Sequence, residues 1–344
     1  MYKGIGLFSG AGGLDIGAEQ AGIDLIYSMD NDPDSVHTLQ SNFSSHDIAL
    51  SDIKDVNFKQ FKKVKNLIIF GGPPCQPFSK NGYWVKNINR DSSEDPRNLL
   101  SQFLRSIDEA KPDAFVFENV ESMTHPSNLN SLNNFKNSIN DIGYHYVFYK
   151  LNAADFGVPQ KRKRIFIIGT RKKIKFSELE QTHFEKTDDL FGSNYQLHEG
   201  VGKYIKPFAL KKYDESYGDA SEGTYYKELV NVLPGKNYMS LAKLNDSSYD
   251  GKTFKSGSRF WNFLYKLDPK LPSITIAAQP GPWVGPFHWT NRRLRVPEIA
   301  AIQTFPLNYN FYGTRRSIQK QIGNAVPVLL AKTIFNHLLE NLSR

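Results

Sequence analysis

The sequence predicts an α/β protein with a doubly wound, mostly parallel sheet and a smaller, irregular second domain. Over about the first 170 residues, short apolar runs alternate with helical patterns, which is typical of a sheet whose strands are joined by crossover helices. From about Ile174 to Pro286 this alternation fades, and Tyr, Ser, Gly, Asn and Lys become frequent. The length of 344 residues suits two domains or one large domain with an insertion.

The individual elements follow from the same patterns. A helix is expected from near Gly13 to Gly22, with small or apolar side chains on one face, and another from Leu99 to Ala110. A final apolar helix is expected from Ala325 to Leu342. The candidate strands are the short apolar runs Ile5–Phe8, Leu25–Met29, Leu67–Phe70, Ala114–Phe117, Tyr146–Lys150 and Arg164–Gly169.

Several polar or reactive side chains lie where an apolar run ends. Phe8, Asp30, Asp52, Cys75 and Glu118 each fall at or just beyond the carboxyl end of such a run. In an open parallel sheet those ends share one edge, and ligands bind there. The sequence therefore predicts that side chains far apart in the chain converge on one crevice.

Composition excludes several classes of protein. No apolar run approaches the roughly 20 residues that cross a bilayer, and the N-terminus has no signal-peptide pattern, so no membrane association is expected. The single cysteine excludes an intramolecular disulfide and suits a cytoplasmic location, and the eight histidines form no ligand-spaced cluster with it, so no metal site is predicted. Lys and Arg total 43 against 35 Asp and Glu, a net charge of +8, which favours a polyanionic partner.

The single cysteine lies in the segment GGPPCQPFS, residues 71–79, directly after a predicted buried strand. A lone cysteine is often a buried and inert side chain. Here two prolines precede Cys75, and because proline cannot donate to a strand ladder, the thiol is expected outside the sheet. A thiolate on such a stiffened loop is well placed to add to an electron-poor carbon.

A glycine-rich turn, residues 8–13, separates the first predicted strand from the first predicted helix. Its glycines permit a tight turn and close approach of a ligand, and the N-terminus of the helix favours negative charge. Asp30, 20 residues after Gly10, is placed to accept hydrogen bonds from ribose hydroxyls. These two features alone favour an NAD-binding fold. A hydride-transfer enzyme, however, has no evident use for Pro-Pro-Cys at the same edge of the sheet.

Gly72-Pro73-Pro74-Cys75-Gln76 resembles the nucleophile loop of DNA cytosine C5-methyltransferases of the bacterial restriction–modification type. These enzymes transfer a methyl group from S-adenosyl-L-methionine to carbon 5 of cytosine. Further motifs of the family occur in the family's order and span nearly the whole chain except roughly residues 175–285. They are FSGAGG at 8–13, ENV at 118–120, QKRKR at 160–164, RLR at 293–295 through QTFP at 303–306, and QIGNAVP at 321–327.

The resemblance implies the fold of S-adenosylmethionine-dependent methyltransferases and a site for that cofactor. The glycine turn is expected to hold the methionine carboxylate, with Phe8 against the adenine, Asp30 on the ribose, and Asp52 with Ile53 at the adenine-binding position. The implied cofactor contacts are Phe8, Gly10, Gly12, Asp30, Asp52, Ile53, Pro74, Leu100, Asn324 and Val326.

The catalytic residues that the resemblance implies are Cys75, Glu118, Arg162 and Arg164. Cys75 adds to carbon 6 of the cytosine, and Glu118 is the acid at N3. Arg164 holds O2 and favours the thiolate, while Arg162 helps to organise the loop. Both arginines alternate on a predicted strand, so their side chains are expected to share one face. Without the resemblance, Glu118 is open to interpretation as a surface residue near a helix start, and residues 161–164 as a nuclear-localisation run or a solvated basic face.

In the family, the last helix returns to pack on the first domain. The resemblance thus implies a catalytic and cofactor-binding domain of residues 1–175 plus 315–344, and a target-recognition domain of residues 176–314. Its expected partner is double-stranded DNA, and we expect a monomer in the bacterial cytoplasm, paired functionally with a cognate restriction endonuclease.

Two alternatives remain beside this interpretation. The first is an RNA (tRNA) cytosine C5-methyltransferase, disfavoured because that branch carries a Cys-Phe-Thr element and this chain has no second cysteine. The second is a catalytically silent DNA-binding regulator, disfavoured because Cys75, Glu118 and Arg164 are all present.

Overall fold

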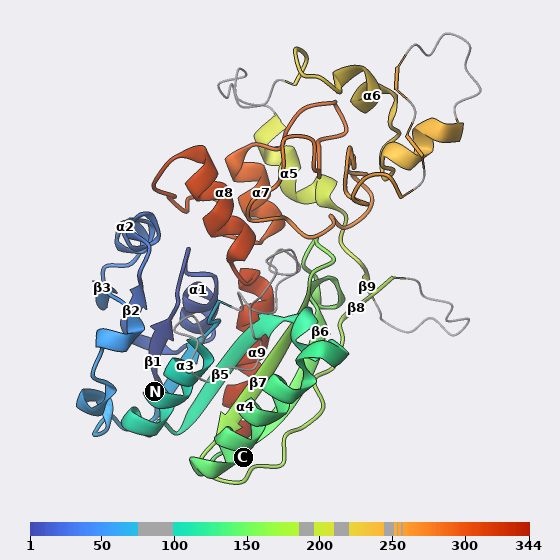
Figure 1. Ribbon diagram of the computed structural model, residues 1–344. Helices are drawn as coiled ribbons and strands as arrows, with labels where there is room; N and C mark the ends of the chain where they lie inside the picture. The colour runs from blue at the N-terminus through green and yellow to red at the C-terminus, as the bar shows by residue number, and fades with distance from the viewer. Residues whose placement is uncertain (75–98, 186–195, 210–219, 244–250, 253, 256) are drawn as a thin grey trace.

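The computed structural model describes residues 1–344 except 75–98, 186–195, 210–219, 244–250, 253 and 256. Its main feature is a seven-stranded sheet with the strand order β3-β2-β1-β4-β5-β7-β6 (Figure 1). β1 to β5 pair in parallel, whereas β7 runs antiparallel to both of its neighbours. The strands are β1 (Lys3–Leu7), β2 (Asp24–Asp30), β3 (Asp47–Leu50), β4 (Leu67–Gly71), β5 (Ala114–Val120), β6 (His145–Asn152) and β7 (Lys163–Thr170).

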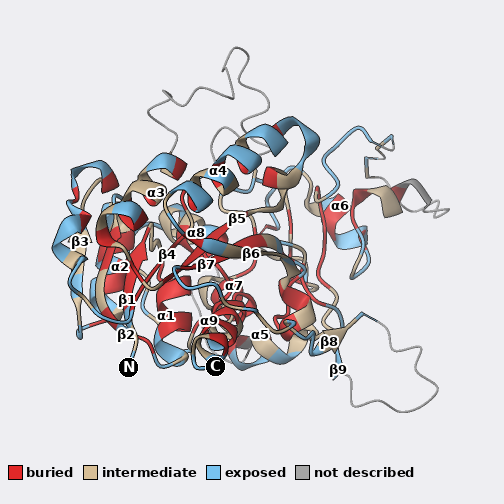
Figure 2. Ribbon diagram, turned by 90° about the horizontal axis from the view of Figure 1, so that it is seen from below, coloured by how far each residue is buried: buried red, intermediate tan, exposed pale blue. Residues whose placement is uncertain are grey.

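Helices cover both faces of this sheet. Figure 2 shows α3 and α4 on one side of the buried strands and α1 with α9 on the other. The helices are α1 (Gly13–Gln20), α2 (Pro33–Asn42), α3 (Leu99–Ala110), α4 (Leu129–Asp141), α5 (Val201–Ala209), α6 (Tyr226–Asn231), α7 (Val296–Ile302), α8 (Arg315–Asn324) and α9 (Val328–Leu342). The arrangement is the doubly wound α/β fold that the sequence predicts.

β4 is apolar along its whole length because each of its faces contacts a separate hydrophobic core. In β4, Ile68 and Phe70 belong to the core shared with α1 and α9, while Leu67 and Ile69 belong to the core under α3 and α4. Successive side chains of a strand point to opposite faces, which explains why this run has no polar position.

All six predicted strands and the three predicted helices are confirmed, with bounds that differ by a few residues. The sequence interpretation did not include β3, because its apolar stretch, residues 48–50, is only three residues long and is at most partly buried. It also did not predict that β7 would be antiparallel, since its buried apolar run resembles those of the parallel strands.

The two ends of the chain pack against each other. Gly17 of α1 lies so close to α9 that a Cβ atom at this position would be 2.4 Å from Cβ of Ala331. The segment Arg315–Leu342 is long and apolar enough to cross a membrane by length and composition alone. It consists of two helices separated near Pro327, and 67% of its most apolar stretch is buried inside the protein. α9 is therefore a core helix of this fold.

Residues 176–314, here called the irregular region, contain few regular elements in their described parts. These are α5, α6, α7 and the two short strands β8 (His183–Phe184) and β9 (Gln196–Leu197). Figure 1 shows much of this region as a lobe beside the sheet. A third hydrophobic core fills that lobe, with Leu229, Tyr238 and Phe287 among its buried members. The domain boundaries themselves stay a prediction.

Candidate active site

A cavity of about 560 Å³ opens at the carboxyl ends of β1 and β4. These two strands are neighbours in the sheet although β2 and β3 intervene in the chain, so the strand order reverses between them. Such a reversal leaves a crevice between the connecting segments, and it is the usual ligand site of open α/β sheets. Of the five residues predicted to converge on one crevice, Phe8, Asp30 and Glu118 line this cavity, whereas Asp52 does not.

The glycine turn forms one wall of this cavity. Phe8 (φ 55°), Gly10 (φ 54°) and Gly12 (φ 77°) all adopt left-handed backbone conformations, which a phenylalanine rarely adopts. The Gly10 N–H donates to Oδ2 of Asp30 over 2.8 Å, and the Asp32 N–H donates to Oδ1 of Asp30 over 2.9 Å. Burial raises the pKa of Asp30. The acid that the sequence places 20 residues after Gly10 thus holds the turn directly.

These residues fit a cofactor that combines a nucleoside with an amino acid. The space in front of Gly10 is open, since a Cβ built there would meet no atom within 4 Å. Asp30 lines the cavity as a hydrogen-bond acceptor suited to ribose hydroxyls, and the first turn of α1 offers N–H groups to a carboxylate. Asn324 and Val326 line the cavity from the C-terminal part of the chain.

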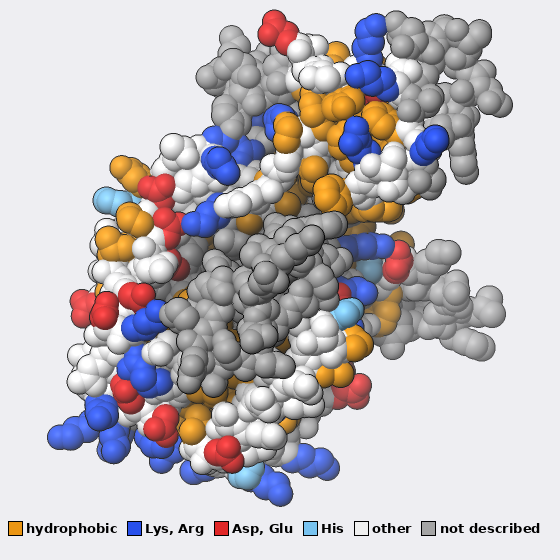
Figure 3. Space-filling view, in the orientation of Figure 1, with side chains coloured by type: hydrophobic (Ala, Val, Ile, Leu, Met, Phe, Trp, Pro, Cys, Tyr) orange, Lys and Arg blue, Asp and Glu red, His pale blue; other side chains and the backbone are white. Residues whose placement is uncertain are grey.

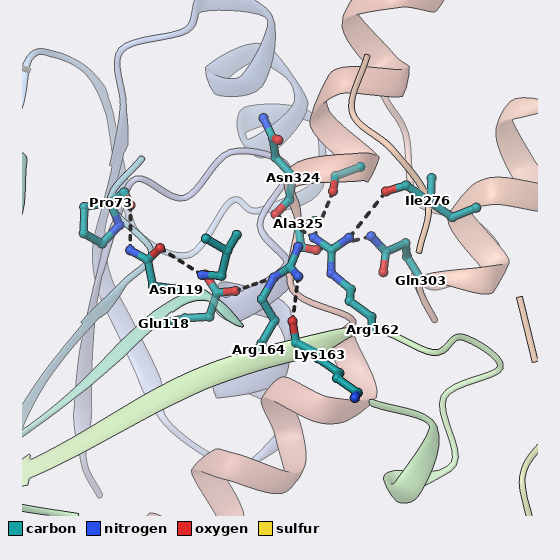
Figure 4. Close-up of polar contacts among 12 residues, drawn as sticks. Pro73, Glu118, Asn119, Arg162, Lys163, Arg164, Ile276, Gln303, Asn324 and Ala325 are labelled. Carbon is teal, nitrogen blue, oxygen red and sulfur yellow. Dashed lines mark hydrogen bonds and ion pairs between the residues drawn. The ribbon is translucent and has the colours of Figure 1, made fainter. Parts of the chain in front are cut away.

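An ion pair between adjacent strands contributes to the lining of the cavity. Glu118 of β5 is only 8% exposed, and its Oε1 lies 3.0 Å from Nε of Arg164 of β7 (Figure 4). Burial raises the pKa of Glu118, against the opposing effects of Arg164 and Arg162. The alternative that Glu118 is a surface residue near a helix start is therefore wrong. The alternative of a solvated basic run is wrong for the two arginines, because Arg162 is fully buried and Arg164 pairs with Glu118.

Beside this pair, the backbone that leads toward the cysteine is held in place. Nδ2 of Asn119 donates to the carbonyl oxygen of Pro73 over 3.2 Å. Gly72 lies so close to Glu118 that a Cβ atom there would be 2.6 Å from Oε2 of the carboxyl group. β5 thus fixes the first residues after β4. Cys75 itself lies outside the described residues.

Arg162 lies one residue before β7 and is fully buried. Its guanidinium group donates to the carbonyl oxygens of Gly323 over 2.9 Å, Asn324 over 3.2 Å and Ile276 over 3.5 Å (Figure 4). It therefore contacts the backbone that forms a wall of the cavity, whereas Arg164 contacts Glu118. The two arginines therefore bind different partners, and the expectation that they share one face stays a prediction.

The structure brings many of the predicted site residues together. Those that line the cavity are Phe8, Gly10, Asp30, Pro74, Glu118, Arg164, Asn324 and Val326. Among the remaining described ones, Ile53 and Leu100 are buried in the core on which Phe8 packs. Asp52 accepts a hydrogen bond from the Lys54 N–H over 3.0 Å at the start of a short helix. Gly12 caps α1.

Other lining residues were not predicted. Asp32 and Lys320 form an ion pair of 3.4 Å at the rim, and Ala277, Ala278 and Gln279 contribute a wall from the irregular region. No motif or spacing in the sequence marks residues 277–279 as part of the cofactor crevice. They reach it because Gln319 of α8 donates to the carbonyl oxygen of Ala277 over 2.8 Å.

A second buried acid, Asp15 of α1, supports the glycine turn from behind. Its Oδ1 accepts hydrogen bonds from Ser9 over 3.0 Å and from Ser28 over 2.7 Å. Its Oδ2 is buried and has no hydrogen-bond partner among the described residues. Burial raises the pKa of Asp15 to about 6. The protonated form therefore stabilises the fold at low pH, and this contribution is lost as the pH rises through the folded-state value.

We expect the substitution Asp15→Asn to reduce the pH dependence of stability. In the wild-type chain, this one group should lower the unfolding free energy by about 1 kcal/mol between roughly pH 5 and pH 7.5. Asparagine keeps an oxygen acceptor for Ser9 and Ser28 but does not titrate. Urea denaturation at the two pH values measures the difference, with the exposed Asp24→Asn as control. An unchanged pH dependence in Asp15→Asn would contradict the raised pKa.

Comparison with known proteins agrees with this geometry. The family described as C-5 cytosine-specific DNA methylase matches residues 2–340. The type II methyltransferase M.SacI of Streptomyces achromogenes is 35% identical, over 98% of this chain and 93% of that protein. The type II methyltransferase M1.HphI of Haemophilus parahaemolyticus is 30% identical, over 98% of this chain and 86% of that protein.

Solved structures share the fold over the full length of the chain. The S. pombe Dnmt2 methyltransferase superposes with a TM-score of 0.68 at 18% identity, covering 100% of both chains. A protein described as a DNA modification methyltransferase encoded within an E. coli prophage gives 0.67 at 23% identity, again covering 100% of both. With the family match over nearly every residue, the chain belongs to the C-5 cytosine-specific DNA methylases and is a DNA cytosine-5-methyltransferase.

Proposed function

We propose that this chain methylates carbon 5 of a cytosine that has been rotated out of a specific short duplex sequence, through a covalent bond between Cys75 and carbon 6. The observation that supports this most is the buried pair of Glu118 and Arg164 in the lining of the cavity, next to the anchored Pro73–Pro74 backbone. An acid and a guanidinium group are thereby placed beside the segment that carries the thiol.

The chemistry of cytosine explains why these groups are needed together. Carbon 5 is a poor nucleophile until the Cys75 thiolate adds to carbon 6, which makes carbon 5 enamine-like. Charge then develops at N3 and O2, where Glu118 donates a proton and Arg164 donates hydrogen bonds. After methyl transfer, loss of the proton from carbon 5 expels the thiolate and restores the aromatic ring. Burial, which raises the pKa of Glu118, favours the protonated carboxyl that this role requires.

Methyltransferases of this kind use a methyl donor, and we propose S-adenosyl-L-methionine for this chain. When bound, it supplies the methyl group as a sulfonium. Asp30 would hold the ribose, the glycine turn and the N-terminus of α1 the carboxylate, and Phe8 the adenine. Arg162 keeps the wall formed by Asn324 in place. Cytosine in a stacked duplex is out of reach of this cavity, so the target nucleotide must leave the helix, at a cost of roughly a few kcal/mol.

The irregular region supports a role in binding the duplex. Figure 3 shows Lys and Arg side chains spread over the lobe of this region. Its exposed basic residues include Lys227, Lys236, Lys252, Lys255 and Arg259. Phosphate neutralisation by such side chains supplies most of the affinity for DNA. We therefore assign target recognition to residues 176–314 and catalysis to residues 1–175 plus 315–344.

The relatives favour a modification enzyme of a restriction–modification system. M.SacI and M1.HphI are both named type II methyltransferases. We propose that the chain is a monomer of the bacterial cytoplasm that protects host DNA from a cognate endonuclease. The likeness to the S. pombe Dnmt2 methyltransferase, at 18% identity, shows a shared fold alone.

The decisive experiment uses a duplex with 5-fluorocytosine at the target position. Sequencing the methylated cytosines in DNA from a host that expresses the chain first identifies the target sequence. With the donor present, fluorine at carbon 5 cannot leave as a proton does, so the adduct should accumulate as a complex that resists denaturation. Mass spectrometry of the digested complex should locate the bond at Cys75. Absence of an adduct, with normal methylation of the unmodified duplex, would contradict covalent catalysis.

A further inference from the structure

The glycine turn has a third anchor, which comes from the far end of the chain. Asp30 accepts the Gly10 N–H, and Asp15 accepts the Ser9 hydroxyl. In addition, the hydroxyl of Tyr309 donates to the carbonyl oxygen of Ala11 over 2.8 Å, across 298 positions of sequence. Burial raises the pKa of Tyr309, so the hydroxyl remains a donor over the whole physiological range.

Tyr309 is itself held in place from several directions. Its ring packs against Phe305 at 5.1 Å and Phe311 at 5.2 Å between ring centroids. The next residue, Asn310, exchanges two hydrogen bonds with the side chain of Asn42 of α2, at 2.9 and 2.7 Å. The Tyr312 N–H donates to the hydroxyl of Thr38, also in α2, over 2.9 Å. The hydroxyl is therefore presented to Ala11 from a fixed backbone.

The position of this hydrogen bond matters because of the conformation of the turn. Ala11 lies between Gly10 and Gly12, both of which have positive φ, and glycine is the residue with the most backbone freedom to lose. Among the described residues, the only backbone hydrogen bond within the glycine turn joins the Gly12 N–H to the Ser9 carbonyl oxygen at 2.7 Å. Fixing the Ala11 carbonyl orients the peptide that enters α1, and with it the N–H groups that face the cavity.

We propose that Tyr309 is a positioning residue for the cofactor, which keeps the glycine turn in its binding conformation before the cofactor arrives. The proposal rests on the assignment of S-adenosylmethionine to the cavity. Preorganisation of this kind lowers the entropy that binding must remove, so its loss weakens cofactor affinity and leaves the chemistry of the bound complex unchanged. Neither the family's motifs nor the cavity lining includes Tyr309.

The test compares Tyr309→Phe with Tyr144→Phe. Each substitution removes one hydroxyl that donates to a backbone carbonyl and leaves the ring in place. The Tyr144 hydroxyl donates to Pro112 over 2.6 Å, just before β5 begins and thus at the edge of the sheet opposite the cavity. A purely structural loss should affect the two variants alike, and both should show a similar decrease in melting temperature.

For Tyr309→Phe, calorimetric titration of the free enzyme should give a dissociation constant for S-adenosylmethionine that is roughly fivefold higher than in the wild type. A change of this size corresponds to the loss of one hydrogen bond. The KM for S-adenosylmethionine should rise by the same factor while kcat stays within about twofold. Tyr144→Phe should bind the cofactor as the wild type does. Equal affinities in the wild type and Tyr309→Phe, or an equal loss in Tyr144→Phe, would overturn the role of Tyr309. A wild-type chain that does not bind S-adenosylmethionine would instead overturn the cofactor assignment.

Discussion

Replacing Cys75 with serine is expected to lower methyl transfer by at least about a thousandfold, because a hydroxyl is far less ionised at neutral pH than a thiol and adds poorly to carbon 6. The proposed contacts of the cofactor, with Phe8, Asp30 and the glycine turn, do not involve the thiol, so the dissociation constant for S-adenosylmethionine should stay within about twofold of the wild type. Transfer of a radiolabelled methyl group measures the first quantity and calorimetry the second.

Binding of the target duplex provides the control for this variant, since a correctly folded preparation should still bind both the duplex and S-adenosylmethionine. Substantial turnover by Cys75→Ser would show that the thiol is dispensable and would remove the covalent step from the mechanism. If the variant lost both cofactor binding and turnover, the cysteine would have a structural role instead.

The substitution Glu118→Gln is expected to lower kcat by about a hundredfold to ten-thousandfold, the usual range for loss of a general acid. Glutamine keeps the size of the side chain but cannot donate a proton to N3. Burial raises the pKa of Glu118, so its carboxyl stays protonated to higher pH than that of a free glutamate. In the wild type, kcat should therefore fall as the pH rises through this value, and the variant should lack that fall.

Glu121→Gln is the matched control for this prediction. Glu121 follows β5 directly, pairs with Lys150 at 2.6 Å and interacts electrostatically with Arg164. Glu121→Gln therefore removes a negative charge near the buried pair while the Glu118 carboxyl stays in place. Its kcat should stay near that of the wild type. DNA affinity, measured by fluorescence anisotropy, should change little in either variant. Equal losses of kcat and DNA affinity in Glu118→Gln would argue against an acid role.

Part of the cavity lining was accessible from sequence, because in a parallel sheet the residues that follow successive strands lie at the same edge. Phe8 and Asp30 each follow an apolar run, and both line the cavity. Short-range patterns of this kind are set by local periodicity, which a sequence displays directly.

The contacts that sequence reasoning missed join segments far apart in the chain. Arg162 reaches the carbonyls of Gly323 and Asn324, and Tyr309 reaches Ala11. The acceptor in each of these hydrogen bonds is a backbone carbonyl oxygen. Because every residue has such an oxygen, the sequence gives no sign of which residue will be the acceptor. The entry of residues 277–279 into the cavity wall has the same origin.

The packing of α9 on α1 also has a consequence for truncated forms of the protein. Val328, Ala331 and Ile334 supply part of the core on the α1 side of the sheet. Removing α9 would expose the apolar side chains that it now covers, and large exposed apolar patches promote aggregation. We therefore expect a fragment that lacks α9 to precipitate.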